Sequence, residues 1–268
     1  MSLPIYNQDL GIIGILAQSV PQEYTDCITF TGETSDFTLK ASHKEWDGTV
    51  EYSTDHKTWT VWNGSEISSS GKKLYLRGSG NTKFYRSNGA QLSLSEKAAC
   101  SGNIQTLLEY SDPPTSISAA NCYKYMFNWC SKLTQAPELP ATTLADYCYQ
   151  YMFYGCTGLT QAPALPATTL AKSCYNYMFN YCTRLTQAPE LPATTLAELC
   201  YYGMFYDCNS IKISATQSSE YSTAWRIPSS GTISSTPTGW NTDMLSYTGG
   251  TFTSDPSINT TYYGAWVK

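Results

Sequence analysis

The residues of this 268-residue chain that could do chemistry are few, and their spacing offers no catalytic constellation. The two histidines, His43 and His56, lack the cysteine or serine context that is typical of a nucleophile pair. Glu138 and Glu190 occupy the same position of a repeat, but Ala164 stands between them. Two steps at strand spacing separate such carboxylates by about 10 Å, which does not fit the roughly 5 Å of a retaining glycosidase and leaves an inverting one open. We therefore expect no catalytic residue and no enzyme, with a carbohydrate-active enzyme as the minor alternative.

Ten cysteines form the other reactive set, and eight of them recur in the phrase Cys-Tyr-x-x-Met-Phe-x-x-Cys. On a helix the two cysteines of one phrase lie two turns apart, roughly 12 Å along the axis, which is too far for a disulfide. Zinc sites usually use CxxC pairs, and the sequence has none. We expect a ladder of buried thiols that act as small hydrophobic side chains, with no metal and no cofactor. A bond between Cys27 and Cys100, which lie outside the phrases, remains open.

The cysteine phrases belong to a repeat with a period of 26 residues. A second phrase, Leu-Thr-Gln-Ala-Pro-x-Leu-Pro-Ala-Thr-Thr-Leu-Ala, occurs three times between them, at 133–145, 159–171 and 185–197. Repetition this regular is typical of a solenoid, in which a unit buries its apolar face only by stacking on its neighbours. The four units begin at Cys122, Cys148, Cys174 and Cys200.

The pattern within one unit predicts a strand, a turn and a helix. Cys148, Met152 and Cys156 are spaced i, i+4 and i+8, which indicates an apolar stripe on two turns of helix. The Leu-Thr that follows begins an extended piece, which Pro163 and Pro166 prevent from continuing.

The phrase Met-Phe-x-Gly-Cys-x-x-Leu-Thr at 152–160 resembles the Ala-Phe-x-x-Cys-x-x-Leu motif of bacterial leucine-rich repeats of the BspA-like type. Leu165 and Pro166 match the Ile-Pro of that family, whereas the Cys-Tyr-x-x that precedes Met152 departs from it. The resemblance covers about residues 113–214. It implies a binding or structural role in surface proteins of gut bacteria or in the tail or fibre proteins of their phages, and no catalytic residue.

Shifts in composition divide the chain into four parts. Residues 1–24 form an arm, which is either a strand packed on the next domain or a segment for docking or oligomerisation. Residues 25–97 contain short strands at about ten-residue spacing, which is typical of a β-sandwich. Residues 98–214 hold the repeats with an N-terminal cap, and residues 215–268 form a C-terminal cap. The expected class is therefore α+β: an antiparallel β-sandwich-like domain followed by a short leucine-rich-repeat solenoid of strand–turn–helix units, with a β and loop cap.

Charge and hydropathy exclude two classes of partner. The net charge is −5, only 14% of residues are charged, and the repeats carry no cluster of basic residues, which excludes a nucleic-acid track. The apolar run at residues 10–17 is too short to cross a bilayer, and no basic residue of a secretory signal precedes it. We expect no membrane insertion and a place outside the cell, at the bacterial cell surface or on a phage virion.

Five aromatic residues are the candidates for ligand binding. Four occupy positions that vary from unit to unit, on or just after the predicted helix. The fifth is Trp62, because strand alternation sends Trp59 and Trp62 to opposite faces of the sandwich and so exposes one of them. The four in the repeats are Trp129, Tyr154, Tyr181 and Tyr206.

These residues indicate a non-catalytic binding or adhesion protein that recognises a surface protein or a glycan. The alternatives are a purely structural virion component, which forms a homo-oligomer through its N-terminal arm, and a surface on which these aromatic residues are merely solvated. The glutamines of the invariant Gln-Ala-Pro phrase, in contrast, are expected to form a hydrogen-bonded ladder that holds the stack. They are Gln135, Gln161 and Gln187.

Overall fold

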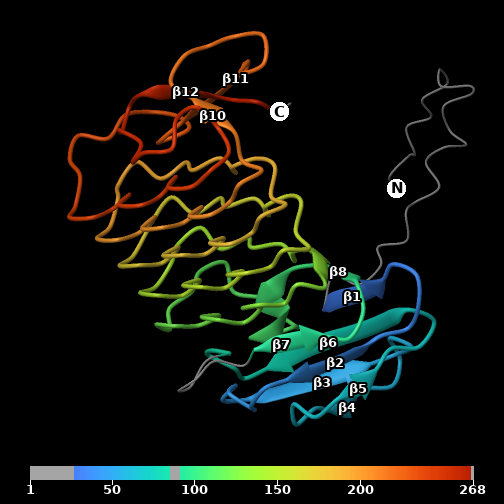
Figure 1. Ribbon diagram of the computed structural model, residues 1–268. Helices are drawn as coiled ribbons and strands as arrows, with labels where there is room; N and C mark the ends of the chain where they lie inside the picture. The colour runs from blue at the N-terminus through green and yellow to red at the C-terminus, as the bar shows by residue number, and fades with distance from the viewer. Residues whose placement is uncertain (1–26, 85–90, 267–268) are drawn as a thin grey trace, which may run out of the picture.

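The computed structural model describes residues 27–84 and 91–266, so the predicted N-terminal arm lies outside the described residues. Within them the secondary structure is nearly all β, and the one helical element is a 3-10 turn, η2 (Ile104–Leu107). A β domain is followed by a stack of coils that rises from it toward the C-terminus (Figure 1). The predicted α+β class with strand–turn–helix leucine-rich repeats is therefore wrong, because the repeats contain no helix in the described part of the chain.

The N-terminal β domain consists of two sheets, in agreement with the β-sandwich-like expectation. Buried side chains of both sheets, such as Phe30 and Leu39, belong to one hydrophobic core. The smaller sheet has the order β5 (Ile67–Ser68), β2 (Thr38–Ala41), β7 (Leu92–Leu94). The larger sheet has the order β4 (Thr60–Val61), β3 (Thr49–Ser53), β6 (Lys73–Ser79), β1 (Ile28–Gly32), β8 (Ala98–Ser101), β9 (Leu133–Gln135).

Each cysteine phrase forms a ladder of consecutive β-turns instead of a helix. In the second coil, every other N–H group donates to a carbonyl three residues back, as Met152 does to Tyr149. The N–H groups between them donate to the next coil, as Phe153 does to Met178 at 3.0 Å. Every backbone N–H and carbonyl from Tyr147 to Tyr154 has a partner within its own ladder or in a neighbouring coil, so the phrase satisfies its backbone only within a stack.

Every fourth residue of the turn ladder adopts the left-handed conformation. In the second coil these are Tyr147, Tyr151 and Gly155, with φ of 59°, 56° and 70°. This conformation costs a non-glycine residue about 1–2 kcal/mol, which the cross-coil hydrogen bonds and the burial of the intervening side chains must offset. The resulting turns send two side chains inward and the next two outward, so that Met152 and Phe153 are buried while Tyr151 and Tyr154 are half-buried.

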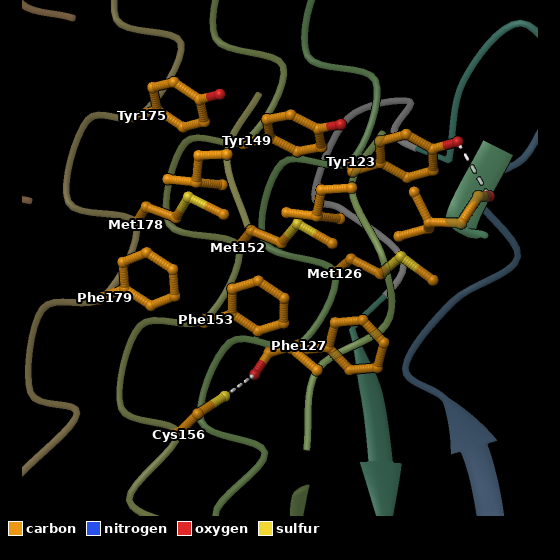
Figure 2. Packing of buried hydrophobic residues seen from close by; sticks show 14 of the residues in the cluster. Tyr123, Met126, Phe127, Tyr149, Met152, Phe153, Cys156, Tyr175, Met178 and Phe179 are labelled. Atoms are coloured by element: carbon orange, nitrogen blue, oxygen red, sulfur yellow. Dashed lines mark hydrogen bonds between the residues drawn. The ribbon is translucent and has the colours of Figure 1, made fainter. Parts of the chain in front are cut away.

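The inward side chains stack in columns along the coils (Figure 2). Tyr149 lies parallel to the tyrosines of the coils on either side, with ring centroids 5.9 and 5.8 Å apart. Phe153 stacks in the same way on Phe127 and Phe179, at 5.5 and 5.6 Å. Repetition at a fixed period thus becomes a continuous hydrophobic core, in which no coil could be buried without its neighbours.

The cysteines also lie in columns inside the stack. The Sγ atom of Cys156 donates to the carbonyl of Phe127 at 2.9 Å, and Cys182 and Cys208 repeat this contact one and two coils further on. All ten cysteines lie in the described part of the chain, are buried, and carry thiols rather than disulfides, so Cys27 and Cys100 are not bonded to each other.

A fifth turn ladder at residues 239–248 completes the stack. Tyr201 donates to the carbonyl of Trp240, and Phe205 donates to that of Met244. Strands β10 (Ile213–Ser214), β12 (Thr261–Gly264) and β11 (Thr223–Arg226) form a three-stranded antiparallel sheet at this end (Figure 1).

The β domain closes the other end of the stack. Strand β9 of the first coil pairs in parallel with β8 of the β domain. The N–H of Phe84 donates to the carbonyl of Cys122, and Ile104 donates to Glu138. The first coil therefore has hydrogen-bonded neighbours on both sides.

Candidate aromatic binding surface

Outward-facing aromatic side chains of successive turn ladders form a surface that we call the aromatic patch. Its centre is three residues from three coils: Trp129 lies 5.1 Å from Tyr154 and 6.2 Å from Tyr181, and the two tyrosines lie 5.7 Å apart, between ring centroids. Tyr206 of the fourth coil and Tyr247 of the fifth continue the patch, with centroids 5.0 Å apart. Five coils thus each contribute one aromatic side chain.

Trp129 has the largest ring of the patch and is 59% exposed, close to the 62% of Tyr247. One side of the ring lies on Gly155, where an added Cβ would overlap the indole carbon Cε3. Gly155 also has a positive φ of 70°, so a glycine suits both the turn and the close approach of the ring. The ring is therefore held by the next coil while much of its surface faces solvent.

The tyrosines of the patch carry polar groups at its surface. The hydroxyl of Tyr181 donates to the Asp207 carboxylate, which raises the pKa of Tyr181. Desolvation and a hydrogen bond with Tyr247 raise the pKa of Tyr206. These hydroxyls are neutral near pH 7 and combine apolar rings with groups that can donate and accept hydrogen bonds.

Trp62, the fifth candidate, does not belong to a surface, and this part of the prediction is wrong. It is 1% exposed, stacks on Trp46 at 5.2 Å and donates its indole N–H to the carbonyl of Ser65 at 2.7 Å. Trp59 is half-buried, and the guanidinium of Arg77 covers its ring at 4.0 Å. Neither tryptophan of this region offers an open ring face comparable to that of Trp129.

The Gln-Ala-Pro phrases line two hollows of about 550 and 340 Å³ elsewhere on the coils. The glutamines were expected to form a hydrogen-bonded ladder, but their side chains have no hydrogen-bond partner among the described residues. Gln135 and Gln161 are exposed at the larger hollow, and Gln187 lines the smaller one.

The two carboxylates considered for catalysis also lie at these hollows. Glu138 lines the larger one and Glu190 the smaller one. In residues 27–84 and 91–266, no group of three or more His, Cys, Asp or Glu side chains is arranged to hold a metal ion. The arrangement at the aromatic patch can stack apolar faces and exchange hydrogen bonds.

Comparison with protein-family models, with curated proteins and with solved structures gave no match for the chain. A search of the described residues for a membrane-crossing helix found none of sufficient length and apolar character.

Sequence reasoning missed two parts of the patch. Tyr247 was not recognised, because the fifth ladder follows the fourth at a longer interval than 26 residues and has Trp240 where the others have cysteine. Gly155 occupies the position of Trp129 and Tyr181 in its unit, and a glycine within a repeat often marks a close approach. The Met244-Leu245 pair, which mirrors the Met-Phe of the other units, was the available signal for the fifth ladder.

Proposed function

We propose that the protein is a non-catalytic binding protein that holds a glycan against the aromatic patch. The observation that carries this proposal is Trp129, which is 59% exposed and whose indole rests on Gly155. Trp129 lies in a contiguous patch of aromatic side chains, and exposed patches of this kind mark interaction sites. The apolar faces of sugar rings stack on such platforms.

The surrounding groups favour a glycan over a purely apolar ligand. The hydroxyl of Tyr181 and the carboxylate of Asp207 lie beside the platform and can exchange hydrogen bonds with sugar hydroxyls. The turn ladders also hold the patch on a hydrogen-bonded stack, so little ordering remains to be done on binding. A protein ligand would use the same residues and is the second candidate.

The location expected from the sequence is consistent with a binding role. A stack of coils that forms a solenoid, and the resemblance to BspA-like surface and fibre proteins, both support an adhesion function at a bacterial cell surface or on a phage virion. A purely structural virion component would need a self-association surface, which was expected in residues 1–24, outside the described residues.

A glycan array probed with the labelled chain tests the proposal. We expect binding to a subset of glycans, loss of about tenfold or more in affinity for Trp129→Ala, and partial retention for Trp129→Phe, because buried aromatic contacts of this kind often contribute about 2 kcal/mol. Val61→Ala is the control, because Val61 is a 65% exposed side chain of the β domain. An array without signal, or binding that Trp129→Ala leaves intact, contradicts the proposal.

The non-catalytic part has its own test. The bound glycan is incubated with the chain and its length is followed by mass spectrometry. We expect no shortening, whereas products that disappear in Glu138→Gln or Glu190→Gln would identify an enzyme.

A further inference from the structure

The two hollows lie on either side of the middle coil and share its lining residues, and we call them together the proline groove. It is lined by the proline-rich halves of three coils, within residues 135–140, 161–166 and 187–192. The middle coil forms the ridge between the hollows, since Ala162, Pro163, Ala164 and Pro166 line both of them. The groove therefore extends over successive coils rather than ending at one.

The backbone of the middle coil is unpaired along this groove. Residues 161–167 have no backbone hydrogen bond to any part of the chain that the structure describes. Pro163 and Pro166 have no N–H to offer, so a regular ladder between the coils cannot form here. The carbonyls and remaining N–H groups are left to solvent or to a ligand.

The equivalent segments of the first and third coils differ, because elements that close the two ends of the stack donate hydrogen bonds to them. On the first coil, Ile104 donates its N–H to the carbonyl of Glu138. On the third coil, the indole N–H of Trp225 donates to the carbonyl of Pro189 at 3.1 Å, and the N–H of Ser229 donates to Leu191 at 2.9 Å. The carbonyls of this segment thus accept hydrogen bonds from other parts of the chain wherever a donor lies close enough.

The side chains of the groove add a preference for positive charge. Its lining contains the exposed carboxylate of Glu138 and no lysine or arginine among the described residues. The exposed amides of Gln135 and Gln161 can each donate and accept a hydrogen bond, and their identity in every copy has no explanation in bonds within the described chain. Opposite charges across such a surface favour encounter and fix register.

We propose that the proline groove binds an extended, positively charged segment of a partner polypeptide. Its backbone exchanges hydrogen bonds with the groups that the prolines leave unpaired, and its basic side chains lie near Glu138. Recognition of extended segments in shallow grooves is an established mode of peptide binding. This site is separate from the aromatic patch and does not depend on the proposed function.

The proposal is tested by selecting, from a displayed library of random peptides, those that bind the immobilised full-length chain. We expect enrichment of peptides rich in lysine and arginine. A selected peptide is then measured against variants of residue 164, where the other two copies carry glutamate. Ala164→Glu should tighten binding by about threefold, whereas Ala164→Lys and Glu138→Gln should weaken it by about threefold, as expected for exposed ion pairs.

Two controls make the result specific. Glu198→Gln removes the same charge at a carboxylate that pairs with Lys172 at 3.0 Å outside the groove lining, and should leave the affinity unchanged. Trp129→Ala should also leave it unchanged, which separates this site from the aromatic patch. No enriched peptide, enrichment of acidic peptides, an affinity insensitive to Ala164→Lys, or self-association in light scattering that Ala164→Lys abolishes would each overturn the proposal.

Discussion

Replacement of Gly155 by alanine tests whether the local backbone positions the indole of Trp129 at the binding surface. Gly155 has φ of 70°, and an added Cβ would overlap the indole of Trp129. The left-handed conformation alone costs alanine about 1–2 kcal/mol. Trp129 and Tyr181 occupy the equivalent position of the neighbouring coils with φ of 59° and 61°, so the turn itself accepts a side chain. The decisive effect of Gly155→Ala is therefore displacement of the indole, in addition to a loss of about 1–2 kcal/mol in stability.

Urea denaturation and glycan affinity measure the two effects separately. We expect Gly155→Ala to lower the free energy of unfolding by about 1–2 kcal/mol, and to lower glycan affinity nearly as far as Trp129→Ala does. Gly203→Ala is the matched control: Gly203 has φ of 57°, and an added Cβ there would overlap Tyr177, which is not part of the patch. It should lose similar stability and keep its affinity. A Gly155→Ala variant of unchanged affinity would refute the placement of Trp129 on Gly155.

Three further perturbations test the core and the β domain. Phe153→Ala should lower the free energy of unfolding by about 3–5 kcal/mol and Phe153→Leu by less than about 1.5, and a loss below about 1 for alanine would contradict the stacked column. Burial raises the pKa of the thiols from 9.0, to about 12 for Cys130 and Cys200, so the unfolded chain ionises first. Stability should therefore be full below pH 9 and fall as the pH rises toward 12, and urea midpoints that stay constant to pH 11 would contradict this. Arg77→Lys should lose about 1 kcal/mol, because its guanidinium lies 4.0 Å over Trp59, and unchanged stability would argue against this contact.

The repeat period could be predicted from the sequence, but the conformation within it could not. Inward pairs such as Cys148–Tyr149 and Met152–Phe153 recur every four residues, and over nine residues this spacing fits a helix of 3.6 residues per turn as well as a turn ladder. Two physical facts favoured the ladder. Tyrosine, cysteine, phenylalanine and asparagine are weak helix formers, and a helix of two turns gains little by itself. In the ladder, half of the N–H groups bond to the next coil, which a pattern within one unit does not reveal.

The positions of the aromatic patch could be predicted because they vary between units, whereas the burial of Trp62 could not. Alternation along a strand sends Trp59 and Trp62 to opposite faces, but it does not tell which face the core covers. Trp62 continues the pairing of β4, because its N–H donates to the carbonyl of Val50, and it packs in the core against Trp46, whereas Val61 before it is 65% exposed. The proline groove was missed because the repeated glutamines were assigned to the stack, and a break in backbone pairing at Pro163 and Pro166 depends on how neighbouring coils lie against each other.

The acceptor of the Phe153 N–H tests the stacked turn ladder most directly. Couplings across hydrogen bonds, measured by NMR on the deuterated and isotope-labelled chain, identify that acceptor. The stack places it at the carbonyl of Met178 in the next coil, 3.0 Å from the nitrogen. A coupling from Phe153 to Met178 is the expected result. A coupling to the carbonyl of Tyr149, four residues back, would show a helix and contradict the stack.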